Sequence, residues 1–336
     1  MMISQRDFLG SLEPLRKLRE SQGLRVALID IEDLYDEFSF GIKSPKAMKD
    51  FLTYAKAKWQ KPPRFVLLAG DASYDPRNYL GLGSFDLVPT KMVDTAYFET
   101  ASDDWFVDFD NNGLPEMAVG RLPVQRAEEA IIIVSKIVGY EKAATRREVV
   151  LISDMKERSD DFDFERASEE LRVLLPGTLT VRKIYRGEFS DDAQATQELI
   201  NGINQGPLLV NFIGHGSIGI WNGVLTPEDV ENLINKGFPF FVAMSCLNGS
   251  FPDIYMDSLS EALMKAPQGG AVAVWMSSGL TEPSRQAPMN KELIRLLFNG
   301  QMLTLGEATA RAKASVSDQD IRRTWILFGD PTTRLK

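Results

Sequence analysis

The chain has 336 residues, 44% of them hydrophobic and 25% charged, which is the composition of an ordinary globular protein with one large or two medium domains. Its net charge of −9 argues against nucleic acid or an anionic membrane surface as a partner, because both are bound through clustered cations. No run of about 18 apolar residues occurs, so no membrane span is expected. The single cysteine excludes an intrachain disulfide, and the polar N-terminus lacks the pattern of a signal peptide.

Strand and helix patterns alternate along the chain, and this alternation predicts a mainly parallel α/β fold. The first part is expected to contain helices at 6–22, 45–59 and 125–141, strands at 24–29 and 65–69, and a loop-rich region at 72–123. A stretch of basic and small residues at 142–147 then predicts a boundary between two tandem subdomains, 1–143 and 144–336. The second part is expected to contain strands at 148–152, 178–184, 208–213, 239–245 and 270–276, and helices at 162–175, 191–204, 227–236, 256–265, 288–299 and 304–316.

The only histidine and the only cysteine of the chain each follow a hydrophobic run. His215 comes after the predicted strand 208–213, and Cys246 comes after the predicted strand 239–245. If both strands belong to one parallel sheet, their carboxyl ends lie on the edge where open α/β sheets bind their ligands. Attack by a thiolate needs a neighbouring base, and imidazole suits that task near neutral pH. The sequence therefore predicts a cysteine nucleophile with a histidine base.

Backbone amides at the same two places are suited to bind an oxyanion. Glycines flank His215, so the N–H of Gly216 is unshielded, and the N–H of Cys246 leaves its strand at the same edge. Asn248 and Gly249 give the turn after the cysteine conformational freedom. The alternatives are a cysteine that is a small buried hydrophobe and a histidine that is a turn residue. The glycine pattern at 214–219 also fits a dinucleotide-binding loop, but no helix opens there and no acidic residue ends the next strand, so we reject that reading.

An acidic loop in the first part has the opening pattern of a calcium loop. Asp108, Asp110 and Asn112 alternate before a glycine, and Glu116 follows. These oxygen ligands suit Ca²⁺, although Val119 takes the place of the glutamate that ends an EF-hand. A structural Ca²⁺ and a plain loop closed by Asx turns are both compatible with the pattern. No cofactor is expected for catalysis.

A strand ending in His-Gly, followed by a hydrophobic strand ending in Cys, resembles the layout of the caspase-like cysteine peptidases. Within that clan the chain is similar to the gingipain family, C25, along nearly its whole length. The matching segments include 31–41, 65–74, 119–123 and 328–331. The resemblance implies a caspase-like three-layer α/β/α fold with mainly parallel sheets. It also implies an endopeptidase that acts on protein or peptide substrates through an acyl-enzyme on Cys246, with His215 as general acid and base.

The resemblance implies further roles and partners. Asp154 corresponds to the acidic residue that orients the histidine, although a solvated loop carboxylate is an equal alternative. Asp161 and Asp163 lie where the better-known members carry the acid that accepts a basic P1 side chain, while a solvated helix start also explains them. The family implies a secreted or cell-surface location. It also implies a propeptide and an immunoglobulin-like domain, and we expect neither within these 336 residues.

Two residues after the cysteine strand are candidates for substrate binding. Trp275, near the end of the strand 270–276, is placed to wall the substrate pocket and is equally suited to the core. Ser277 follows on the expected edge of the cleft. Two other functions stay open: a transpeptidase of the same family that anchors cargo at the cell surface, and a caspase-like scaffold domain without turnover.

Overall fold

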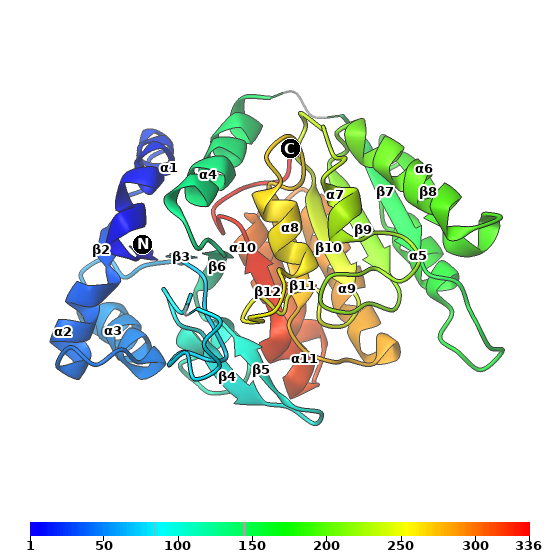
Figure 1. Cartoon of the computed structure of the whole chain (residues 1–336). Coiled ribbons are helices and arrows are strands. Elements are labelled where there is room, and N and C mark those ends of the chain that lie inside the picture. The colour runs from blue at the N-terminus through cyan, green and yellow to red at the C-terminus, as the bar shows by residue number, and fades with distance from the viewer. Residues whose placement is uncertain (84, 144–145) are drawn as a thin grey trace.

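The computed structural model describes residues 1–83, 85–143 and 146–336, and ten of the described strands form one sheet between two layers of helices (Figure 1). The strand order in this sheet is β2-β1-β3-β6-β12-β11-β10-β9-β7-β8. A separate hairpin pairs β4 with β5. The strands are β1 Met2–Ser4, β2 Leu28–Asp30, β3 Phe65–Ala69, β4 Lys91–Asp94, β5 Glu99–Ser102, β6 Ala118–Leu122, β7 Glu148–Ser153, β8 Thr180–Tyr185, β9 Leu209–Ile213, β10 Phe240–Met244, β11 Ala273–Ser277 and β12 Trp325–Phe328.

Helices cover both faces of the sheet. Helices α1, α4, α8 and α7 contact one another in a row on one face, while α5, α9 and α10 contact one another behind the strands in Figure 1. The helices are α1 Leu9–Ser21, α2 Ile31–Ser39, α3 Pro45–Lys58, α4 Ala127–Lys142, α5 Phe164–Arg172, α6 Asp192–Asn204, α7 Pro227–Val230, α8 Leu259–Lys265, α9 Pro283–Phe298, α10 Leu305–Ala312 and α11 Gln319–Thr324. The predicted three-layer α/β/α class is confirmed.

The strands that carry the candidate dyad, β9 and β10, are neighbouring interior strands of this sheet. Every residue of β9 and β10 is buried, as expected for parallel strands with helices on both faces. The one polar residue in β9, Asn211, exchanges hydrogen bonds of 2.9 and 3.1 Å with Asn290 of α9. The buried amides are therefore satisfied, and the two strand ends are fixed from both faces.

Strand β12 joins the two parts of the chain. It runs antiparallel to β11 and meets β6 through the pair Phe328 and Arg121. The strands before it come from the first part of the chain and those after it from the second, so the sheet is continuous across both. The predicted division into 1–143 and 144–336 stays a prediction, and residues 144–145 at that junction lie outside the described residues.

Several elements differ from their predicted bounds. The region 72–123 is not all loop, because it contains β4, β5 and β6. Strand β6 was hidden by Gly120 and the buried Arg121, which interrupt its apolar pattern. Helix α7 has four residues rather than ten, and α9 begins earlier than predicted, at Pro283. One strand that the sequence analysis did not predict, β1, precedes the first helix.

No helix in the described ranges is long and apolar enough to cross a membrane.

Candidate active site

The structure brings the single histidine and the single cysteine to neighbouring strand ends. Strands β9 and β10 are parallel, with Ile213 paired to Met244, and the N–H of Gly214 donates to the carbonyl of Met244 at 3.2 Å. His215 and Cys246 each lie two residues beyond that last pair, on strands that are spaced about 4.8 Å apart. The histidine is exposed and the cysteine is half-buried, so both are accessible at one edge of the sheet.

The turn after Cys246 is held in an unusual backbone conformation. Leu247 has a φ of +63°, in the left-handed region that few residues other than glycine adopt. Its N–H donates to the carbonyl of Gly279 at 3.1 Å, and the N–H of Gly249 donates to the carbonyl of Ser277 at 2.8 Å. The unusual backbone conformation of the turn was expected at Asn248 and Gly249, but it occurs at Leu247. These hydrogen bonds attach the turn to the end of β11 and the residues after it.

The thiol of Cys246 lies against the backbone of Thr281. The N–H of Thr281 donates to Sγ at 3.4 Å, and the thiol donates to the Thr281 carbonyl at the same distance. Thr281 is held in turn by Gln286, whose side-chain oxygen accepts from the threonine hydroxyl at 2.8 Å.

Asn248 joins the loop after the histidine to the turn after the cysteine. Its side-chain amide donates to the carbonyls of Ser217 at 2.5 Å and Ile220 at 3.0 Å, and its oxygen accepts from the hydroxyl of Ser245. The residue is completely buried. Because the amide bridges the two segments, it sets their relative position.

His215 is held by its backbone and by one aromatic neighbour. Its N–H donates to Asp154 at 3.2 Å, and its carbonyl accepts from the N–H of Asn222 at 3.0 Å. The ring of Phe164 stands edge-on to the imidazole, with centroids 5.1 Å apart and an interplanar angle of 78°. Within residues 1–83, 85–143 and 146–336, no side chain forms a hydrogen bond with the imidazole.

The structure places the Asp154 carboxylate beneath the backbone of the histidine rather than on its ring. The carboxylate is buried and accepts from the N–H groups of His215 and Met155, and it pairs with Arg186 at 2.9 Å. The hydrogen bonds that Arg186 donates to Asp192 and, secondarily, to Asp154 raise the pKa of the guanidinium, which stays charged. Gly214 makes this approach possible, because a Cβ there would come within 2.6 Å of the Cβ of Asp154.

Two backbone amides of the site have no hydrogen-bond acceptor in the described part of the chain: the N–H groups of Gly216 and Cys246. Both belong to the segments that follow β9 and β10. Gly216 is confined to a small space, since a Cβ there would lie 2.8 Å from the side-chain oxygen of Asn248. The amides are therefore available to an oxyanion.

The other candidate substrate residues have local structural partners. Asp161 accepts from the N–H of Arg158 at 2.6 Å, and Asp163 caps α5 by accepting from the N–H of Arg166 at 2.9 Å. Both precede Phe164, the residue that contacts the histidine, so they lie in the segment leading to the site.

Trp275 and Ser277 are both buried. Trp275 has no exposed surface and packs edge-on against Trp325 in the core, so it does not wall a pocket in this structure. Ser277 donates to the carbonyl of Gly279 at 3.1 Å and supports the turn beside the cysteine.

Comparison with known proteins decides the family. The profile of Peptidase family C25 matches residues 1–336. The chain belongs to peptidase family C25. Gingipain R2 and gingipain R1 of Porphyromonas gingivalis are each 22% identical to it over 99% of this chain, which spans 45% and 33% of their lengths. The chain thus spans less than half of the curated relatives it matches.

Solved structures agree on the fold. The Arg-specific cysteine proteinase gingipain R superposes with a TM-score of 0.85 at 20% identity, covering 100% of this chain and 78% of that one. The dimeric latent PorU of Porphyromonas gingivalis superposes with a TM-score of 0.52 at 18% identity, covering 99% of this chain and 30% of that one. The caspase-like architecture expected from the sequence is therefore confirmed for this C25 chain.

The predicted calcium loop of this C25 chain is closed by its own hydrogen bonds. Asp108 accepts from the N–H groups of Asn112 and Gly113, and Glu116 accepts from the N–H of Phe109 and pairs with Lys56. No cluster of three acidic, histidine or cysteine side chains suited to a metal occurs among the described residues. The structural Ca²⁺ at Asp108, Asp110, Asn112 and Glu116 stays a prediction.

Three residues of the site were not found from the sequence: Phe164, Arg186 and Asn222. Arg186 directly follows β8, whose carboxyl end lies beside that of β7, and this strand-end position was a usable signal. Phe164 and Asn222 lie on a helix start and a loop, and nothing in their sequence spacing connects them to the histidine.

Proposed function

We propose that this chain is a cysteine endopeptidase in which Cys246 is the nucleophile and His215 the general acid and base. The observation that carries the proposal is the placement of the only thiol and the only imidazole at the ends of two paired parallel strands. The family and the fold support the same chemistry.

The proposed reaction has two steps. In the first, His215 takes the thiol proton, Sγ of Cys246 bonds to the scissile carbonyl carbon, and the C–N bond breaks as the imidazolium protonates the leaving amine. The carbonyl oxygen, negative in the tetrahedral intermediate, accepts from the N–H groups of Gly216 and Cys246. In the second step the imidazole takes a proton from water, water attacks the thioester carbon, and the thiolate leaves.

The geometry supports this assignment without a preformed pair. Catalytic hydrogen bonds are often open before substrate binds, and the imidazole here is held only through its backbone and by Phe164. Asp154 acts in this proposal by fixing the backbone of His215, with Arg186 holding the carboxylate. Its role is therefore positioning.

We also propose cleavage after a basic P1 residue. The name of one solved relative describes it as Arg-specific. In this chain Asp161 and Asp163 precede the residue that contacts His215, and the net charge of −9 favours a cationic substrate. By the same family relationship we propose a secreted or cell-surface location.

Active-site labelling tests the proposal. The folded chain is incubated with peptidyl acyloxymethyl ketones bearing Arg, Lys, Asn, Asp or Leu at P1, and the mass shift is measured for wild type, Cys246→Ala and His215→Ala. Because Cys246 is the only cysteine, each shift reports one thiol. Labelling that requires both residues and prefers Arg or Lys supports the proposal. Labelling by iodoacetamide but by none of the peptidyl probes would overturn it and favour a scaffold.

A further inference from the structure

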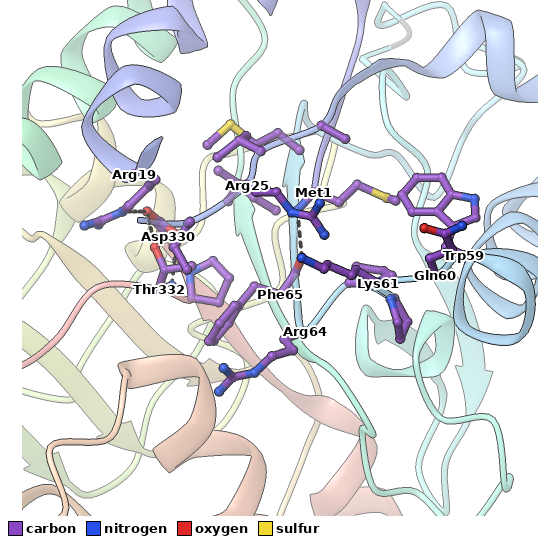
Figure 2. A pocket seen from close by; sticks show the side chains of 18 residues that line it. Met1, Arg19, Arg25, Trp59, Gln60, Lys61, Arg64, Phe65, Asp330 and Thr332 are labelled. Atoms are coloured by element: carbon purple, nitrogen blue, oxygen red, sulfur yellow. Dashed lines mark hydrogen bonds and ion pairs between the residues drawn. The ribbon is translucent and has the colours of Figure 1, made fainter. Parts of the chain in front are cut away.

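A cavity of about 540 Å³ lies away from the dyad, among the connections at the amino ends of β1, β2 and β3 (Figure 2). Three segments surround it: 24–27 between α1 and β2, 59–64 between α3 and β3, and 330–332 after β12. This volume is typical of small-molecule sites. None of its lining residues belongs to the candidate active site.

The interior of this cavity is apolar and rigid. Met2 of β1 and Leu67 of β3 are buried and line it. Its walls include Trp59 and Phe65, which Figure 2 labels beside Met1, together with the prolines at 62, 63 and 331. Prolines fix the backbone, so the walls need little reordering when a ligand binds.

The rim carries an excess of positive charge. Four basic side chains line the cavity against one acidic side chain, which gives a local charge of +3 in a chain whose net charge is −9. The one carboxylate, Asp330, is already engaged: Arg19 donates to it at 2.7 Å, and the hydroxyl and N–H of Thr332 donate at 2.9 Å. Asp330 therefore does not neutralise the other three basic side chains of the cavity.

Two of those cations have no partner of their own. Arg64 pairs with Glu307 at 2.8 Å. Arg25 and Lys61, by contrast, form no ion pair or hydrogen bond with any residue that the structure describes. Arg25 comes from the segment before β2 and Lys61 from the segment before β3, so the two unpaired cations stand on different walls of one apolar cavity.

We propose that this cavity binds a small amphiphile with a single carboxylate head and an unbranched apolar tail, in the manner of a medium-chain fatty acid. The carboxylate pairs with Arg25 and Lys61, because a guanidinium matches a carboxylate in a bidentate geometry. The tail lies against Trp59, Phe65 and the buried Met2. The proposal does not depend on the peptidase function.

Isothermal titration calorimetry with hexanoate, octanoate and decanoate tests the proposal on the full chain. Binding is expected to tighten along the series by up to ~4-fold per methylene until the cavity is filled. Decanol is expected to bind at least ~10-fold more weakly than decanoate, since it lacks the charge. Quenching of Trp59 fluorescence, absent in Trp59→Phe, places the ligand in this cavity.

Charge variants separate the site from general cation binding. Arg25→Gln with Lys61→Gln is expected to weaken decanoate at least ~10-fold. Lys58→Gln, an exposed neighbour outside the cavity, is the matched control and should leave affinity unchanged. All three positions are exposed, so circular dichroism should show native folding. No binding up to ~5 mM decanoate, equal binding of decanol, or equal loss in the control overturns the proposal. The proposal is also overturned if an acidic peptide binds to the chain and decanoate does not.

Discussion

Replacing Asn248 by leucine removes the buried amide that joins the histidine loop to the cysteine turn. The change deletes two donors, to the carbonyls of Ser217 and Ile220, and the acceptor for Ser245. Orphaned polar groups of this kind cost about 1–3 kcal/mol of unfolding free energy. Since the amide sets the position of the His215 loop, we also expect kcat/KM and the labelling rate of Cys246 to fall by ~10²-fold, as small misplacements of catalytic groups do.

Asn235→Leu is the matched control for this variant. Asn235 is equally buried, donates to the carbonyls of Gly237 and Gly270 at 2.8 Å each, and accepts from the N–H of Gly270. It lies before β10, at the opposite end of that strand from Cys246. Urea denaturation should show a similar loss of stability, about 1–3 kcal/mol, with activity per folded molecule within ~3-fold of wild type. Similar activity loss in both variants would refute the positioning role of Asn248.

Three further substitutions test the structure. Gly214→Ala should destabilise the fold by about 2 kcal/mol or more and abolish labelling, because the new Cβ meets Phe212 at 2.5 Å and Asp154 at 2.6 Å; an active, stable variant would contradict this packing. Burial raises the pKa of Asp71 to about 6, so the wild type loses stability as pH rises from about 4 to about 6. Between pH 4 and 7 the unfolding free energy of Asp71→Asn should therefore rise by roughly 2–3 kcal/mol relative to that of the wild type. If the unfolding free energies of the two proteins instead change in parallel with pH, the pKa shift of Asp71 is absent. Burial lowers the pKa of Lys136 to about 7, so the unfolding free energy of the wild type should rise above that pH, by about 2 kcal/mol from pH 7 to about 9. Denaturation of Lys136→Met over the same pH range should show no such rise.

The position of the dyad could be predicted because it depends on strand ends. Apolar runs before His215 and Cys246 mark buried parallel strands, and parallel strands bring their carboxyl ends to one edge. The identities of these two residues then indicate the chemistry. The family was also readable, since its matching segments are spread along the chain.

The side-chain contacts around the dyad could not be predicted in the same way. The carboxylate of Asp154 was expected at the imidazole, but it lies on the backbone N–H, because Gly214 allows it to approach the chain itself. Trp275 was compatible with both a pocket wall and the core, and only its packing against Trp325 separates the two. The loop at Asp108 has the composition of a metal site, and the composition does not show that the N–H groups of Asn112 and Gly113 donate to the Asp108 carboxylate.

The place of β12 in the sheet has a consequence for biosynthesis. This strand, residues 325–328, is the last of the ten to leave the ribosome, yet it lies between β6 and β11 in the middle of the sheet. Until β12 is made, β6 and β11 each have an unpaired edge that β12 covers in the finished protein. Unpaired strand edges can pair with other chains. A ribosome-bound or prematurely terminated chain is therefore the form most exposed to aggregation, and a chaperone that covers β6 and β11 would protect it.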